Sequence, residues 1–300
     1  MGPAIPKAPS MSNVIQHLPE RQLAPLLASY HAAVVKRRIR FVLSSLVLLA
    51  CSLTAIWWVD FNPAMLVAKI GTFTDYFGRI FTLDNQQPVW TDLPDWFWGL
   101  DKWSKLLLET LLIAYTGTVL GAIGAFFLCF LAASNLSGAK TRWAARRLLE
   151  FCRTVPDIVF ALIFVLAFGL GSMAGVLALT IHTLGALGKL YTEIVENIDM
   201  KPVDGVTSTG GTRPETIFYA VLPQVWSGFA TYTLLRFEIN FRGASIMGFV
   251  GAGGIGQELI TVVRKFYYSD VSAILLMIVL TVFVLDILTG GILKRLNRSA

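Results

Sequence analysis

Charged residues are scarce in this sequence. They form 15% of its 300 residues, whereas roughly 25% is usual for soluble domains. Hydrophobic residues form 55% of the chain, and they are gathered into runs of about twenty, the length at which a helix crosses the hydrocarbon core of a bilayer. So few charged groups could not cover so much apolar surface in water. The composition therefore excludes an ordinary soluble protein and predicts an all-α, polytopic membrane protein.

Cysteine and histidine are also rare, with three of each. Cys51, Cys129 and Cys152 lie in or beside apolar runs, without the spacing of metal ligands or of a disulfide framework. The ionisable residues of the apolar runs do not suggest a Ser-His-Asp arrangement either. We therefore expect no metal site, no catalytic residue and no cofactor bound by this chain.

The net charge is +6, and the positions of the basic residues indicate which side of the membrane each loop faces. Basic residues cluster beside the ends of apolar runs, as in "KRRIR" before residue 41 and "KRLNR" after residue 293, and such clusters mark the cytoplasmic side of a membrane. We expect both termini in the cytoplasm, and membrane lipid rather than nucleic acid as a partner.

Six transmembrane helices are expected. Residues 1–40 are predicted to form a cytoplasmic segment and residues 41–59 the first transmembrane helix. The loop 60–104 carries six aspartates and an aromatic-rich stretch, which suits the periplasmic side. The other five spans are expected within residues 105–297, near 106–133, 155–170, 176–190, 223–250 and 271–293.

The stretch "GFVGAGGIGQEL" has the glycine spacing of a dinucleotide-binding loop. Only 44 residues follow Gly256, and about 23 of them form another apolar run, so the second half of a nucleotide-binding sheet has no room. We instead place these glycines at the outer mouth, where they let helices pack closely or let backbone re-enter the membrane. This prediction covers Gly251, Gly253, Gly254 and Gly256.

A second motif, "GALGKL" at 185–190, resembles a phosphate-binding loop only in part. A Walker A loop has the pattern G-x-x-x-x-G-K-[ST], with one glycine five positions before the glycine that precedes the lysine. In this sequence the glycine before the lysine is Gly188, so the first glycine would be at position 183 and the Ser or Thr at position 190. Here position 183 is Thr and position 190 is Leu. The chain is therefore predicted to be no enzyme and to have no ATPase motif of its own.

Ionisable residues within the fifth predicted span indicate a polar pathway, because a charge at membrane depth is costly unless it pairs or faces water. Glu238 and Arg242 have i, i+4 spacing and are predicted to form a structural pair. Arg236 and Asn240 share a different face, which leaves a guanidinium for the oxygens of an anion. His182 in the fourth span could line the same pathway or hydrogen-bond between helices. The alternative for Arg236, Glu238, Asn240 and Arg242 is that all four only join helices.

The longest polar segment between later spans is "KPVDGVTSTGGTRPETIFYAVLPQ" at 201–224. Pro202 is predicted to start one short helix, which ends at Gly210 or Gly211. Thr212 and Glu215 have the spacing of a capping box for a second helix, which is predicted to end before Pro223. Such a segment is either an ordinary connector or a rigid element that transmits force.

This segment resembles the EAA loop of ABC-importer permeases, which docks a short helix into a groove of the ATPase. Its pattern, E-A-A-x3-G-x9-I-x-L-P, can be aligned on Leu222 and Pro223. The initial acid is then Asp204 and the glycine Gly210, while Gly205 and Val206 replace the two alanines and Ala220 replaces the isoleucine. The resemblance implies contact with the ATPase for Asp204, Gly205, Val206, Thr207, Gly210, Leu222 and Pro223.

Several segments in order resemble the phosphonate-import permeases, among them "RTVPDIVFALIFV", "YAVLPQVWSGF" and "RFEINFRGASIMGFVGAGGIGQEL". The resemblance implies a type I importer core of five helices at 105–297, with a cytoplasmic coupling loop at 191–222 and one extra N-terminal helix. It also implies a homodimer, two ATPase subunits that hydrolyse ATP, and a periplasmic substrate-binding protein. The location that it implies is a bacterial inner membrane. The implied function is alternating access for phosphonates or related phosphorus oxyanions. The alternative from the buried charges is an ion-coupled secondary transporter of a small anion.

Overall fold

The computed structural model describes residues 20–83 and 85–299 of the chain. Within these ranges the secondary structure is helical, apart from an isolated bridge between Thr82 and Pro88. The chain divides into two compact units, residues 1–73 and 74–300. The all-α prediction is confirmed.

The first unit contains one long helix, α2 (Glu20–Trp58), which begins well before the predicted residue 41. Its apolar spanning stretch is Tyr30–Trp58, 29 residues long. The basic cluster "KRRIR" does not interrupt this helix, because Lys and Arg are good helix formers. The helix α3 (Pro63–Ala68) follows, and the side chain of Asn62 caps it by accepting hydrogen bonds from two backbone N–H groups.

The predicted loop 60–104 contains further short helices. Their sequences have the signals of helix starts, such as Asp92 before Leu93, whose side chain accepts a hydrogen bond from the backbone N–H of Asp95 at 3.2 Å. The segment is therefore more ordered than a simple loop. Besides α3 it comprises α4 (Ile70–Ile80), η1 (Val89–Thr91), α5 (Leu93–Trp96) and the start of α6 (Leu100–Ala132).

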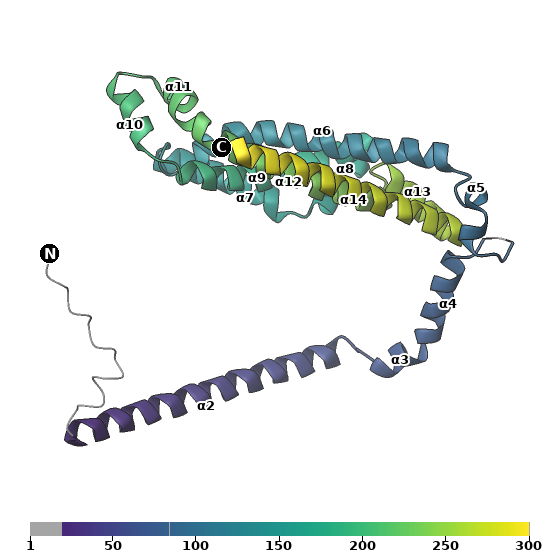
Figure 1. The fold of residues 1–300 in the computed structure, drawn as a ribbon, viewed down its shortest axis with the longest axis horizontal. Coiled ribbons are helices and arrows are strands. Elements are labelled where there is room, and N and C mark those ends of the chain that lie inside the picture. The colour runs from purple at the N-terminus through teal and green to yellow at the C-terminus, as the bar shows by residue number, and fades with distance from the viewer. Residues whose placement is uncertain (1–19, 84, 300) are drawn as a thin grey trace, which may run out of the picture. The chain divides into compact units, whose positions relative to one another are not determined.

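The second unit is a helical bundle built on α6 and α9 (Ser172–Glu196), which pack along one another (Figure 1). A Cβ on Gly117 would lie 2.7 Å from that of Leu179, and a Cβ on Gly121 would lie 2.7 Å from that of Thr183. Small residues therefore allow the two backbones to approach closely, as is common between helices in membranes. The other helices of the bundle are α7 (Ala139–Thr154), α8 (Asp157–Phe168), α12 (Leu222–Met247), α13 (Ile255–Arg264) and α14 (Tyr268–Ser299).

The third predicted span, 155–170, is interrupted at its start and is shorter than expected. The helix α8 has 12 residues, which is about 18 Å at 1.5 Å per residue and less than the thickness of a hydrocarbon core. It is bent by 84° from α7, because Pro156 disfavours helical geometry at Val155. Within the described residues four helices can cross a membrane, or up to six if each of two bent pairs counts as one span.

The glycine-rich segment joins α12 to α13 through a tight turn. A short 3-10 turn, η3 (Gly248–Val250), follows α12, and Gly251, Gly253 and Gly254 then have φ values of 88°, 84° and 74°. Only glycine adopts such values readily. A helix precedes this turn, whereas a dinucleotide-binding loop follows a strand, so the segment lacks the architecture of that motif.

Gly256 is required for a different reason, namely the closeness of the backbone. A Cβ at this position would overlap the carbonyl oxygen of Ser245. We expect Gly256→Ala to lower the free energy of unfolding by about 1–3 kcal/mol, because the turn must shift to accept one methyl group. Thermal melting of the detergent-purified protein measures this loss.

Gly290→Ala is the matched control, because a Cβ on Gly290 in α14 would meet no atom within 4 Å. It should leave the melting temperature unchanged or raise it, since Ala favours a helix more than Gly. If both variants melt at the temperature of the native chain, the close approach at Gly256 does not contribute to stability.

Candidate functional site

The predicted cytoplasmic loop forms a pair of short helices. They are α10 (Lys201–Ser208) and α11 (Arg213–Thr216), and they project from one end of the bundle (Figure 1). Gly210 ends the first with a φ of 84°, and Glu215 accepts hydrogen bonds from the backbone N–H and the hydroxyl of Thr212 at 2.6 and 2.7 Å. The predicted turn and capping box are confirmed.

The second short helix, α11, ends at Thr216 and thus before Pro223, as predicted, but no loop follows it. A π-helical turn, η2 (Ile217–Val221), connects α11 directly to α12. Pro223 lies in the first turn of α12 and has no backbone N–H to donate to an earlier carbonyl oxygen, so it interrupts the α-helical hydrogen bonds at this junction. The helix pair is therefore continuous with a long helix of the bundle, which favours a rigid element over a loose connector.

One face of α10 is packed and the other is free. Val203 is buried in a core cluster that includes Ala220 and Val221, and Val206 and Leu222 pack against the same cluster. The side exposed to solvent carries Asp204, Gly205, Thr207, Gly210 and, on α12, Pro223. Most of the residues assigned to ATPase contact thus lie on an open surface, while Val206 and Leu222 hold that surface on the bundle.

Polar contacts tie the helix pair to the turn between α6 and α7. Arg213 donates hydrogen bonds to the carbonyl oxygen of Leu136 at 2.9 Å and to the hydroxyl of Ser137 at 2.7 Å. On the same turn the amide of Asn135 donates to the carbonyl oxygen of Val195 at 2.7 Å. The sequence did not single out Arg213, because one of its partners is a backbone group and both lie far away in the chain.

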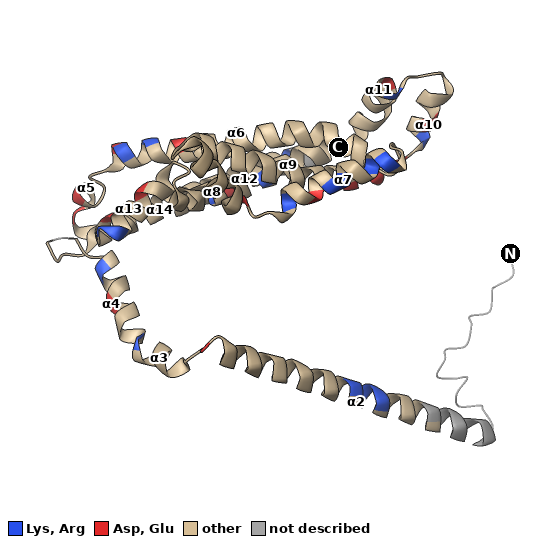
Figure 2. Ribbon diagram, turned by 180° about the vertical axis from the view of Figure 1, so that it is seen from behind, with Lys and Arg blue, Asp and Glu red and all other residues tan. Residues whose placement is uncertain are grey.

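A second set of contacts joins the α6–α7 turn to the end of α9. Glu196 forms an ion pair with Arg146 at 2.5 Å and accepts a hydrogen bond from the backbone N–H of Ser134 at 2.7 Å. Arg146 also donates to the carbonyl oxygen of Ala132 at 2.9 Å. Figure 2 shows basic residues along α7 close to this end of the bundle. A displacement of the helix pair would therefore reach α6, α7 and α9 together.

The predicted pathway residues on α12 fall into different environments. Asn240 is only 1% exposed, and its amide donates to the hydroxyls of Thr118 and Thr183, both at 2.8 Å. Asn240 thus joins α12 to α6 and α9, which is the interhelical alternative that the sequence left open. It does not share an open face with Arg236, so that part of the pathway prediction is corrected.

Glu238 and Arg242 form the predicted ion pair. The side chain of Glu238 is 12% exposed and that of Arg242 is 53% exposed. Arg242 therefore provides an ionic partner for the largely buried carboxylate of Glu238. This is the structural pair that the i, i+4 spacing predicted.

Arg236 is half-buried, and its Nε atom is buried without a hydrogen-bond partner among the described residues. Asp157, the first residue of α8, interacts with it electrostatically. His182 lies near both of these groups, and its Nδ1 is 3.2 Å from the carbonyl oxygen of Val155. The structure thus brings Arg236 and His182 together and adds Asp157. The sequence signal for Asp157 was its position directly after a helix-breaking proline.

The glycine cluster is buried, because every residue from 251 to 256 is buried. The backbone N–H of Ile255 donates to the hydroxyl of Thr110 at 2.9 Å, and the N–H of Gly171 donates to the carbonyl oxygen of Gly251. The cluster therefore holds the α12–α13 turn against α6 and the start of α9. The helices α13 and α5 lie at the end of the bundle opposite to α10 and α11 (Figure 1).

Comparison with known proteins gives a consistent result. Residues 117–300 match the family described as binding-protein-dependent transport system inner membrane component. The chain is 35% identical over 247 residues to the phosphite transport system permease protein PtxC of Stutzerimonas stutzeri, covering 79% of this chain and 90% of that protein. It is 34% identical over 242 residues to the phosphate-import permease protein PhnE of Mycolicibacterium smegmatis, covering 80% of this chain and 43% of that protein.

The fold is similar to that of a chain of the MetNI methionine ABC transporter in inward-facing conformations. The TM-score is 0.57 at 17% identity, with 65% of this chain and 95% of that chain covered. The two chains thus share a helical fold over 65% of this chain.

The chain belongs to the family of binding-protein-dependent transport system inner membrane components. Its relatives are transport permease subunits, which favours an importer permease over an ion-coupled secondary transporter. The resemblance to importer permeases for phosphorus compounds is confirmed.

Proposed function

We propose that this chain carries a phosphorus oxyanion, of the class of phosphite, phosphonates and phosphate esters, through the bacterial inner membrane. The observation that supports this cargo is Arg236, whose guanidinium lies inside the bundle with a buried and unpaired Nε. A guanidinium offers forked N–H donors that match the oxygens of a tetrahedral oxyanion. The two relatives are a phosphite transport permease and a phosphate-import permease, which favours the same chemical class.

We propose further that the permease works as a homodimer with two ATPase subunits and a periplasmic substrate-binding protein. The chain itself binds no cofactor, and ATP is hydrolysed by the partner subunits. Both termini lie in the cytoplasm, and so do α10 and α11, while α5 and α13 lie on the periplasmic side. The basic residues of α7 support this orientation by the positive-inside rule.

Transport would proceed by alternating access. Closure of the ATPases on ATP would push the exposed face of α10, and the contacts of Arg213 would pass this displacement to the α6–α7 turn. The bundle would then open toward the binding protein, and hydrolysis would return it to the inward-open state. The permease supplies the path and the ATPases supply the free energy.

The proposed function is tested by uptake into proteoliposomes that contain the permease with its ATPase and receive the binding protein outside. Radiolabelled phosphite and methylphosphonate should enter only when ATP is present inside the liposomes. A sodium or proton gradient alone should support no uptake. Uptake driven by a gradient without ATP would contradict the proposal and restore the ion-coupled alternative.

A further inference from the structure

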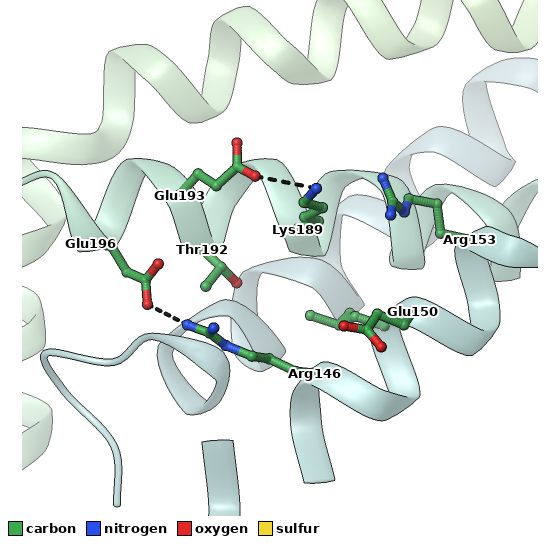
Figure 3. A pocket seen from close by; sticks show the side chains of 8 residues that line it. Arg146, Glu150, Arg153, Lys189, Thr192, Glu193 and Glu196 are labelled. Atoms are coloured by element: carbon green, nitrogen blue, oxygen red, sulfur yellow. Dashed lines mark hydrogen bonds and ion pairs between the residues drawn. The ribbon is translucent and has the colours of Figure 1, made fainter. Parts of the chain in front are cut away.

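A charged cleft lies between α7 and α9. It holds about 160 Å³ of space and is lined by Arg146, Leu149, Glu150, Arg153, Lys189, Thr192, Glu193 and Glu196. In Figure 3 the pair of Glu196 and Arg146 lies toward one end, and Arg153 from α7 and Lys189 from α9 lie toward the other. None of these residues was assigned to the pathway by the sequence.

The cleft is adjacent to the Arg236 site. A Cβ on Gly185 would lie 2.5 Å from the backbone nitrogen of Arg153, so Arg153 sits against α9 at the level of Gly185. His182 and Lys189 lie three residues before and four residues after Gly185, on the same face of α9. Arg236 and Arg153 both act electrostatically on His182. His182 therefore lies within electrostatic reach of both Arg236 and Arg153, and Lys189 lies on the same face of α9.

Most charged side chains in and beside the cleft form ion pairs, and the end that holds Arg153 keeps an unpaired positive charge among the described residues. Arg146 pairs with Glu196 at 2.5 Å and Arg147 pairs with Glu150 at 2.7 Å. Lys189 and Glu193 are 3.5 Å apart, and both side chains are about half exposed. Among the described residues Arg153 has no hydrogen bond or ion pair through its side chain. Arg153 is therefore free, and Lys189 is held by the longest of these three ion pairs.

We propose that Arg153 and Lys189 form an anion-binding site at which the cargo pauses on leaving Arg236 for the cytoplasm. This inference rests on the proposed function for the identity of the anion. Arg153 donates from its guanidinium, and Lys189 exchanges Glu193 for the oxyanion. Glu193 and Glu196 lie further along α9 and repel the departing anion, so the site binds weakly enough to release it. Conduction through a pore requires such a balance between binding and release.

Chemical modification of the intact complex with ATPase and binding protein tests the site directly. Phenylglyoxal modifies accessible arginines, and mass spectrometry of peptides measures the rate at each position. Phosphite should slow modification of Arg153 severalfold relative to chloride at equal ionic strength. Arg147 is the matched control, because it lies on the same helix, is exposed and has its own partner in Glu150. Its rate should be the same in both salts.

Uptake by variants supplies the second readout. Arg153→Gln should lower the rate of phosphite uptake roughly tenfold, the loss expected for one charge-assisted contact. Arg153→Lys should retain most of the rate because the charge remains, and Arg147→Gln should transport like the native protein.

Two results would overturn the site: equal protection of Arg153 and Arg147 by phosphite, or equal uptake by Arg153→Gln and Arg147→Gln in a complex that transports phosphite. A native complex that transports no phosphorus oxyanion would instead contradict the proposed function. In that case the modification experiment still decides whether Arg153 binds an anion.

Discussion

Arg236→Gln is expected to lower uptake of an anionic cargo by roughly 10- to 100-fold, the range that corresponds to losing a hydrogen bond to a charged group. Gln keeps a polar side chain at this position but removes the positive charge and the forked donors. Inside the bundle a lost charge is not replaced by bulk water, so the anion loses its main attraction along α12. Vesicle uptake of phosphite, measured with basal ATPase activity, tests this result. Basal activity and assembly should stay near those of the native complex.

Glu238→Gln is the matched variant on the same helix. It removes the partner of Arg242, whose side chain is 53% exposed, so water can replace part of the lost pairing. We expect a small loss of stability, about 0.5–1 kcal/mol, and nearly unchanged uptake per folded complex. If Arg236→Gln melts the complex while Glu238→Gln alone abolishes uptake, the pathway and structural roles on α12 have been exchanged.

Gly210→Val is expected to uncouple the permease from its ATPases. The φ of 84° at Gly210 is unfavourable for a β-branched residue by about 1–3 kcal/mol. The turn after α10 should relax toward negative φ and displace the exposed face that carries Asp204. Gly210 is exposed and a Cβ there would meet no atom within 4 Å, so the bundle itself should remain folded. Uptake should fall at least roughly tenfold, which corresponds to about 1.4 kcal/mol, and stimulation of the ATPase by loaded binding protein should be lost.

Gly205→Ala is the control for this prediction. Gly205 lies within α10, its φ is not positive, and a Cβ there would also meet no atom within 4 Å. Gly205 lies on the face predicted to contact the ATPase, but Ala is the residue that the EAA pattern has at this position. Ala also fits a helix at least as well as Gly, so the variant should transport normally. Normal uptake and normal ATPase stimulation in Gly210→Val would show that the turn after α10 does not determine coupling.

The amino-acid sequence predicted the features that depend on neighbouring residues. The membrane class follows from contiguous apolar runs, and the capping box of Thr212 and Glu215 closes over three residues. Glu238 and Arg242 are four residues apart and form an ion pair. The turn at Gly210 depends on a single residue, because glycine has no Cβ and adopts a positive φ readily. Each of these can be evaluated within a few positions of the chain, which is why the structure agrees with them.

The extent of several helices could not be predicted in the same way. The helix α2 begins at Glu20 and continues through a basic cluster, because helix propensity and membrane hydropathy are different quantities. The helix α8 is only 12 residues long, since it begins after Pro156 and ends before Gly169, whose φ is 89°, within an apolar run that hydropathy alone counts as one span. Hydropathy describes which residues prefer lipid and does not describe where the backbone bends.

The sequence by itself determined that this chain is a helical membrane protein, that a turn follows α10 at Gly210 and which two charges pair on α12. Only the tertiary structure decided that Asn240 joins helices, with partners 122 and 57 residues away, and that Arg153 lies against Gly185. Those roles depend on which residues meet after the helices pack, and one helix's periodicity gives the direction of a side chain but not its partner. Arg236 and Asn240 differ for this reason. Packing buries Asn240 between α6, α9 and α12, whereas the buried Nε of Arg236 has no hydrogen-bond partner in the part of the chain that the structure describes.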